Sequence, residues 1–274
     1  MRFRVAMHLV LGAICLLAAS SSAQQDKAAE HLSKGMALAE SGDVDGAIAE
    51  YKAAIRANPD FAFAHNDLGL AYAKKQFLDD AIAEFREALR ITPDDAVVHY
   101  NLALALRAKG SVDGAIAEYS AAVRLKPNLI EARTNLGELL DERGDLDGAV
   151  AQYREVLRLK PEMAIPHNNL GSVLHKKGEL AEAISEFREA IRLKPLYPAA
   201  HFNLGLGLYD QGNTAAAMDE YNEALRQNPG LAKAHFYLAR ALADRGDADG
   251  AAREYAEAQR LDPRLKPPAT STIK

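Results

Sequence analysis

The chain has 274 residues, of which 26% are charged and 49% hydrophobic, an ordinary composition for a soluble globular or solenoid protein. The formal net charge is −5, and an acidic chain without a long basic run is a poor match to nucleic acid, whose binding depends on Lys and Arg contacts to phosphates. The single cysteine is Cys15, so a mature chain that begins after it has no disulfide, thiolate metal site or cysteine nucleophile.

The N-terminus has the pattern of an export signal. Arg2 and Arg4 precede a mostly apolar run over residues 5–19, and small residues follow at 21–23. We expect residues 1–23 to be a signal peptide and residues 24–27 a short lead-in, which places the mature protein in the periplasm or outside the cell. An uncleaved anchor is an alternative, although the run is short for a membrane-spanning helix, which needs about 20 residues. Lipidation of Cys15 is a third possibility, which the bulky Ile14 disfavours.

A 34-residue period follows, marked by prolines at 59, 93, 127, 161, 195, 229 and 263. A fixed period of this length indicates stacked supersecondary units. With the proline placed at position 32 of each unit, residues 28–265 divide into seven repeats: 28–61, 62–95, 96–129, 130–163, 164–197, 198–231 and 232–265. Residues 266–274 are expected to form a flexible tail.

Each repeat has the pattern of two helices joined by a short turn. Position 20 is always Ala, position 24 is always Tyr or Phe, and position 8 is always Gly or Ala. Positions 4, 8 and 11 share one helical face and positions 20, 24 and 27 share another, so the small residues let the helices approach closely beside the ring. We call the first helix of a repeat helix A and the second helix B.

The ends of the helices are also marked. Position 15, which is Gly in six repeats and Gln76 in the second, ends helix A, and the proline ends helix B. Aspartates at position 18 suit the N-cap of helix B. They are Asp45, Asp79, Asp113, Asp147 and Asp249.

This pattern resembles the tetratricopeptide-repeat family. In the fifth repeat Asn169-Leu170-Gly171, Ala183, Phe187, Ala190 and Pro195 follow the family motif. The resemblance implies an all-α fold, an α-solenoid in which seven tetratricopeptide repeats form a right-handed superhelix. The departure is position 4, usually a bulky apolar or aromatic residue, which is His in six repeats and Arg133 in the fourth.

The six histidines at position 4 invite comparison with a metal site, but neighbouring packed helices lie about 8–10 Å apart and one His per repeat cannot converge on one ion. We interpret each as a partly buried ring in place of the family's aromatic residue. Because His titrates near pH 6.5, we expect mild acid to loosen the solenoid. These histidines are His31, His65, His99, His167, His201 and His235.

Other motifs indicate neither a metal site nor catalysis. The tetrapeptides Asp43–Gly46, Asp145–Gly148 and Asp247–Gly250 resemble the start of a calcium loop, but an amphipathic helix follows at once, so we interpret them as turns and caps. No G-x-S-x-G, H-E-x-x-H or phosphate-binding glycine loop occurs. We therefore expect a non-enzymatic protein without a cofactor or metal.

Positions 2, 6, 9 and 13 of helix A form one stripe, which we call the helix A stripe. In the resembled family this stripe lines the concave groove, so the resemblance implies a peptide-binding surface. Position 6 carries Asp67, Asn101, Asn135, Asn169, Asn203 and Tyr237, and the apolar candidates are Phe63, Leu70, Val97, Leu104, Ile165 and Leu206. The successive asparagines are similar to the ladder in the repeat domain of O-linked N-acetylglucosamine transferases, which grips peptide backbones, although Asn here is also ordinary solvated filler.

The leading hypothesis is a protein–protein interaction scaffold that holds polypeptide segments in the groove, in envelope assembly or secretion. The alternatives are an accessory component of a glycosyltransferase system and a structural spacer that self-assembles through its ends. We expect protein or peptide partners, no nucleic acid, no membrane insertion after signal cleavage, and a monomer or an end-to-end dimer.

Overall fold

The computed structural model describes residues 23–266, and within this range the regular structure is helical throughout. Residues 1–22 of the expected signal peptide, Cys15 among them, and most of the expected tail lie outside the described residues. A first helix covers residues 23–41 and includes the expected lead-in. It is followed by α2 (Val44–Ala57), α3 (Ala62–Lys74), α4 (Leu78–Ile91), α5 (Ala96–Ala108), α6 (Val112–Leu125), α7 (Ile130–Arg143), α8 (Leu146–Leu159), α9 (Ala164–Lys176), α10 (Leu180–Leu193), α11 (Pro198–Asp210), α12 (Thr214–Gln227), α13 (Ala232–Asp244) and α14 (Ala248–Leu261).

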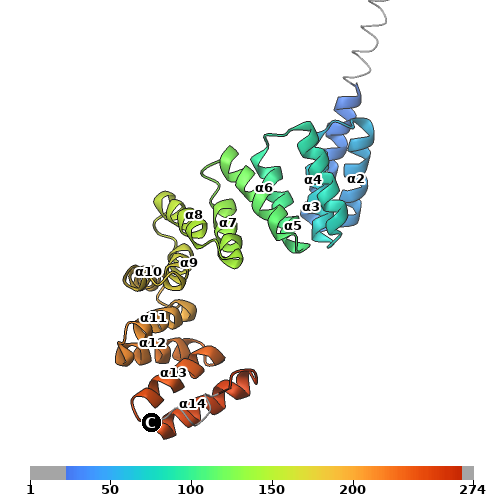
Figure 1. The fold of residues 1–274 in the computed structure, drawn as a ribbon. Helices are drawn as coiled ribbons and strands as arrows, with labels where there is room; N and C mark the ends of the chain where they lie inside the picture. The colour runs from blue at the N-terminus through green and yellow to red at the C-terminus, as the bar shows by residue number, and fades with distance from the viewer. Residues whose placement is uncertain (1–22, 267–274) are drawn as a thin grey trace, which may run out of the picture. The chain divides into compact units, whose positions relative to one another are not determined.

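The chain divides into two compact units, Met1–Ala132 and Arg133–Lys274, and both are built from helical hairpins (Figure 1). In the first unit each helix from α2 to α6 packs on the next, and α3 also touches α5. In the second unit the same holds from α8 to α14, where α9 touches α11 and α11 touches α13. Within each unit these consecutive A helices therefore contact one another directly, as in a solenoid.

The hairpins close around position 8, where glycine faces the ring at position 24. A Cβ atom built on Gly69 would lie 2.7 Å from the Phe85 ring, and one on Gly205 would lie 2.5 Å from the Tyr221 ring. Both distances are too short for real carbon atoms, so the close approach of the two helices depends on the missing side chain. This confirms the packing predicted from the small residues.

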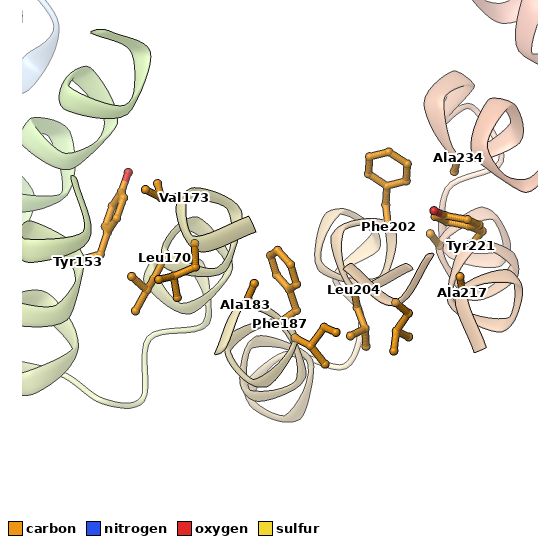
Figure 2. Close-up of a cluster of buried hydrophobic side chains, with 14 of the residues drawn as sticks. Tyr153, Leu170, Val173, Ala183, Phe187, Phe202, Leu204, Ala217, Tyr221 and Ala234 are labelled. Carbon is orange, nitrogen blue, oxygen red and sulfur yellow. The ribbon is translucent and has the colours of Figure 1, made fainter. Parts of the chain in front are cut away.

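The core of the second unit repeats this arrangement from hairpin to hairpin. Figure 2 shows Tyr153, Phe187 and Tyr221 beside small or aliphatic side chains such as Ala183 and Leu204. These rings are almost completely buried. The position-24 aromatics therefore serve as the main core residues in a chain with few large rings.

The turn between the helices requires a left-handed backbone at position 15. The six glycines there have φ between 81° and 90°, and Gln76 has φ 64°. Such values are costly for residues with a Cβ atom. Gln76 is thus a strained exception to the glycine that ends helix A elsewhere.

The caps of helix B correct one prediction. The N-cap is position 16, and Asp43, Asp145 and Asp247 accept hydrogen bonds from the N–H groups of Gly46, Gly148 and Gly250. Position 18 lies in the first turn, where the helix dipole favours a carboxylate. Because the helix begins two residues earlier than expected, Asp45 and Asp147 are free of the capping role and pair with lysines of the next repeat, Lys75 and Lys177.

Candidate peptide-binding surface

The helix A stripe places its apolar residues at the surface. Phe63, Leu70, Val97 and Leu104 on α3 and α5, and Ile165 on α9, are all exposed, with Phe63 reaching 67%. Leu206 and Tyr237 are half-buried. Because these positions come from successive A helices, the stripe continues from repeat to repeat within each unit.

The first unit carries most of this exposed apolar surface. Met36, at position 9 of the first repeat, is also exposed and was not among the residues predicted for the stripe. It occupies the same position as Leu70 and Leu104, so the period itself was the signal that identifies it. Val97 also lines a shallow hollow formed by the loop over residues 92–96 and the end of α6.

An amide relay joins position 5 to position 6 in the first unit. The Asn101 side-chain N–H donates to Asn66 Oδ1 at 2.9 Å, and the Asn66 N–H donates to Asp67 Oδ1 at 3.1 Å. An ionised carboxylate only accepts hydrogen bonds, so Asp67 fixes the direction of the relay. Burial raises the pKa of Asp67 above its ordinary value, although the Asn66 hydrogen bond opposes this shift.

The same relay occurs in the second unit. Asn203 Nδ2 donates to Asn168 Oδ1 at 2.9 Å and to Ser172 Oγ at 3.2 Å, and Asn168 Nδ2 donates to Asn169 Oδ1 at 3.4 Å. Both amide hydrogens of Asn203 are thus used inside the protein. Asn101 is buried, at 8% exposure, while Asn135 and Asn169 are half-buried. At Asn203 the ladder therefore links repeats, and its N–H donors do not point to a partner.

Aromatic and charged residues cluster at the end of the stripe in the second unit. The Tyr237 ring lies 5.8 Å from the Phe202 ring and 6.3 Å from the Tyr221 ring, and the Arg240 guanidinium lies 5.4 Å from the Tyr237 centroid. Tyr237 is therefore a rigid aromatic residue that remains partly accessible, with a cation over its face.

A second set of contacts joins position 12 of one repeat to position 13 of the next. Lys176 Nζ lies 2.7 Å from Asp141 Oδ2, His175 Nε2 lies 2.7 Å from Asp210 Oδ2, and Tyr209 donates to Asp244. Burial, followed by the hydrogen bond to Asp244, raises the pKa of Tyr209 to about 12. These contacts were not predicted from the sequence, because the two residues of each pair are 35 residues apart and only the stacking of repeats brings them together.

The described residues 23–266 contain no group of three or more His, Cys, Asp or Glu side chains arranged to hold a metal ion. In the same range no helix combines the length and apolar character needed to cross a membrane. What the stripe does offer is apolar contact area flanked by amides and charges. This chemistry suits non-covalent binding of a polypeptide segment.

These features define the class of protein, an α-solenoid of helical hairpins with an exposed stripe on its A helices. A family model described as tetratricopeptide repeat matches residues 32–96, 134–198, 185–232 and 202–265, and one described as TPR repeat matches residues 104–142. The chain belongs to the tetratricopeptide repeat family. Stacked repeats of this kind present extended binding surfaces.

Solved structures agree with this assignment. MamA is 26% identical, with 58% of this chain and 93% of that chain covered and a TM-score of 0.54. The Pseudomonas aeruginosa pilF protein is 25% identical, with 74% and 92% covered and a TM-score of 0.61. YrrB, described as a TPR protein with an unusual peptide-binding site, shares the fold at 23% identity, with 65% and 92% covered and a TM-score of 0.55. A comparison with curated protein sequences gives no match.

Proposed function

We propose that this protein is a non-enzymatic scaffold that binds segments of other polypeptides along the helix A stripe. The observation that carries this proposal is the distribution of exposed apolar side chains in residues 23–266. Six of the nine large ones lie at positions 2 or 9 of helix A. They are Met36, Phe63, Leu70, Val97, Leu104 and Ile165.

The first unit is the proposed main contact surface, because five of these six side chains lie there, on three consecutive A helices. Apolar side chains gathered in one patch, rather than scattered singly, are typical of interaction sites. A partner with apolar side chains on one face, either an amphipathic helix or an extended segment, would bury them.

The cellular setting is part of the proposal and rests on the sequence of residues 1–23. We place the mature protein in the periplasm or outside the cell, where it serves envelope assembly or secretion. The absence of a recognised catalytic motif and the binding chemistry of the stripe both favour a scaffold over an enzyme.

The stripe can be tested with a double substitution, Phe63→Ser with Val97→Ser, in the protein used to capture partners from the exported fraction. The captured polypeptide should then bind the double variant at least about tenfold more weakly, since buried apolar anchors dominate such interfaces. Titration by calorimetry or fluorescence measures this change, and circular dichroism checks that helicity is retained.

The matched control is Leu196→Ser. Leu196 is 71% exposed but lies in the turn before α11, outside the stripe. Its replacement should leave the affinity unchanged. Equal binding by the double variant and the wild type would show that the partner sits elsewhere.

The asparagine relay makes a backbone-gripping ladder of the O-linked N-acetylglucosamine transferase type the weaker alternative, since Asn203 already uses both N–H donors internally. An accessory role in a glycosyltransferase system depends on such a ladder. The self-assembling spacer predicts association of the purified protein, which light scattering detects.

A further inference from the structure

The histidines at position 4 make a repeated contact that the proposed function does not use. In five repeats both ring nitrogens have a partner. Nδ1 lies 2.5–2.7 Å from the carboxylate at position 23 on helix B of the same repeat, and Nε2 lies 2.9–3.2 Å from the proline carbonyl that ends the preceding repeat.

We call this three-part contact the histidine clamp. Its members are His65 with Glu84 and Pro59, His99 with Glu118 and Pro93, His167 with Glu186 and Pro161, His201 with Glu220 and Pro195, and His235 with Glu254 and Pro229. Each clamp lies within one unit. In the first repeat, His31 contacts Glu50 at 2.6 Å.

Both partners of the ring are hydrogen-bond acceptors. A neutral imidazole carries one N–H, so it can donate to the carboxylate or to the carbonyl, whereas the imidazolium donates to both. In the neutral form one nitrogen lone pair faces an oxygen atom. His65 and His201 are only 6% and 8% exposed, so water does little to relieve that conflict.

The charged groups around the ring are mostly acidic. Besides the carboxylate at position 23, helix B carries a glutamate at position 26 in four of the five clamps, and Ala121 replaces it beside His99. Each of these four glutamates forms an ion pair with the arginine at position 29. They are Glu87 with Arg90, Glu189 with Arg192, Glu223 with Arg226, and Glu257 with Arg260.

Two further groups reach the same repeat junctions. Arg90 also contacts Asp60, next to Pro59, at 2.6 Å. Gln227 donates to the Pro195 carbonyl at 3.0 Å, alongside His201. The guanidinium groups at position 29 and the Gln227 amide keep their charge between pH 5 and 8, whereas imidazole is the side chain that ordinarily changes its charge in this range.

The fourth repeat provides an internal comparison. Arg133 replaces the histidine and Gln152 replaces the glutamate, and Arg133 Nη1 donates to Gln152 Oε1 at 3.0 Å. Arginine is always protonated and has several donors, while the glutamine amide is neutral. The histidine and the glutamate of the other repeats are thus both replaced in the fourth repeat. Neither an arginine nor a glutamine side chain changes its charge between pH 5 and 8.

We propose that the position-4 histidines are proton-dependent clamps between consecutive repeats, which hold the hairpins of each unit together more firmly in mild acid than at alkaline pH. Protonation of the ring ties helix B of its own repeat to the end of the preceding one. Loss of the proton releases one of the two contacts and loosens the junction.

The pKa of His65 has the sign that this mechanism requires. Burial lowers the pKa of His65, but the hydrogen bonds to Glu84 and to the Pro59 carbonyl together raise it by more. The pKa of His65 therefore lies above its ordinary value of 6.5. A pKa raised by folding contributes stability that is fully present below pH 6.5 and is lost as pH rises through the folded value. The expectation that mild acid loosens the solenoid is therefore wrong in sign at His65.

The test compares the wild type with a triple-pair variant that copies the fourth repeat into repeats five, six and seven: His167→Arg/Glu186→Gln, His201→Arg/Glu220→Gln and His235→Arg/Glu254→Gln. For each protein we take the Tm at pH 5.5 minus the Tm at pH 8. This difference should be about 3–6 °C larger for the wild type than for the variant. Comparing pH differences removes the contribution of His175, which is unchanged in the variant. Equal pH differences in the two proteins would overturn the proposal.

A second measurement does not depend on the variants. Nitrogen-15 NMR should show the His65 ring of the wild type mostly doubly protonated at pH 6.5, with both nitrogens as N–H, because its pKa is raised above that value. A His65 ring that is mostly neutral at that pH would contradict the mechanism whether or not the variant folds.

Discussion

At the scale of single residues, the position-8 glycines decide how closely two helices of a repeat approach. Ala103 and Ala239 occupy this position in the third and seventh repeats and are fully buried, so a methyl group is tolerated where the backbone leaves room. At Gly205 it is not, because the Tyr221 ring would lie 2.5 Å from the new carbon.

We predict that Gly205→Ala destabilises the protein by about 1–3 kcal/mol, the usual cost of overpacking a core. Chemical denaturation followed by circular dichroism measures this loss. The control is Gly114→Ala in α6, whose added carbon would meet mainly the Ser111 hydroxyl, a group able to rotate away. That variant should be neutral or more stable, because alanine is the better helix former by about 1 kcal/mol. Equal losses in both variants would contradict the packing argument.

Some residue roles were readable from the sequence and others were not. The ring at position 24 and the glycine at position 8 were predictable, because each recurs at one place in the period. The relay from Asn203 to Asn168 was not, because it depends on which face of one repeat meets the next. A pattern within a repeat shows which residues share a helix face. It does not show whether a side chain at the junction bonds to its own repeat or to the next one, and Asn168 does both.

At the scale of elements, the start of helix B was predicted at the correct turn, but its N-cap was assigned to position 18 instead of position 16. Asp145 and Asp147 both lie at the start of α8, and both suit a cap by residue type. The backbone decides, because the turn after Gly144 places Asp145 outside the helix and Asp147 inside its first turn.

We predict that Asp145→Ala lowers the stability by about 1 kcal/mol, the typical cost of a lost N-cap. Asp147→Ala should cost less, because Asp147 is an exposed residue paired with Lys177 on the surface. Thermal denaturation of the two variants at low and high salt separates the roles. Only the Asp147 effect should shrink at high salt, and a larger loss from Asp147→Ala would restore position 18 as the cap.

At the scale of the whole molecule, the chain is a series of equivalent junctions within each unit. Contacts between neighbouring repeats recur at the same separation, as in the pairs Asn168–Asn203 and His175–Asp210, both 35 residues apart. Stability is then close to a sum over repeats and their interfaces. The period in the sequence was sufficient to predict this architecture, since each hairpin cannot bury its apolar face alone.

We predict that deletion of residues 198–231, one complete repeat, leaves a folded protein with a lower denaturation midpoint. The seventh repeat has His235 and Asp244 at the positions of His201 and Asp210, so it can meet the fifth repeat through equivalent contacts, although Tyr237 replaces Asn203. Deletion of residues 214–230 removes α12 alone and places α11 directly before α13. Although it removes fewer residues, this second variant should lose more stability, since α11 is left without its hairpin partner α12 and the alternation of A and B helices is broken. Circular dichroism and denaturant titration test both, and a more stable half-repeat deletion would contradict the modular description.

The histidine clamp also gives the contact between consecutive hairpins a direction along the chain. The proline carbonyl at the end of one hairpin receives its N–H donor from the hairpin that follows, as Pro195 does from His201. Within each unit, a hairpin that carries the clamp therefore completes the hydrogen bonding of the hairpin before it, and removing a repeat from the C-terminal side leaves the preceding proline carbonyl without that donor.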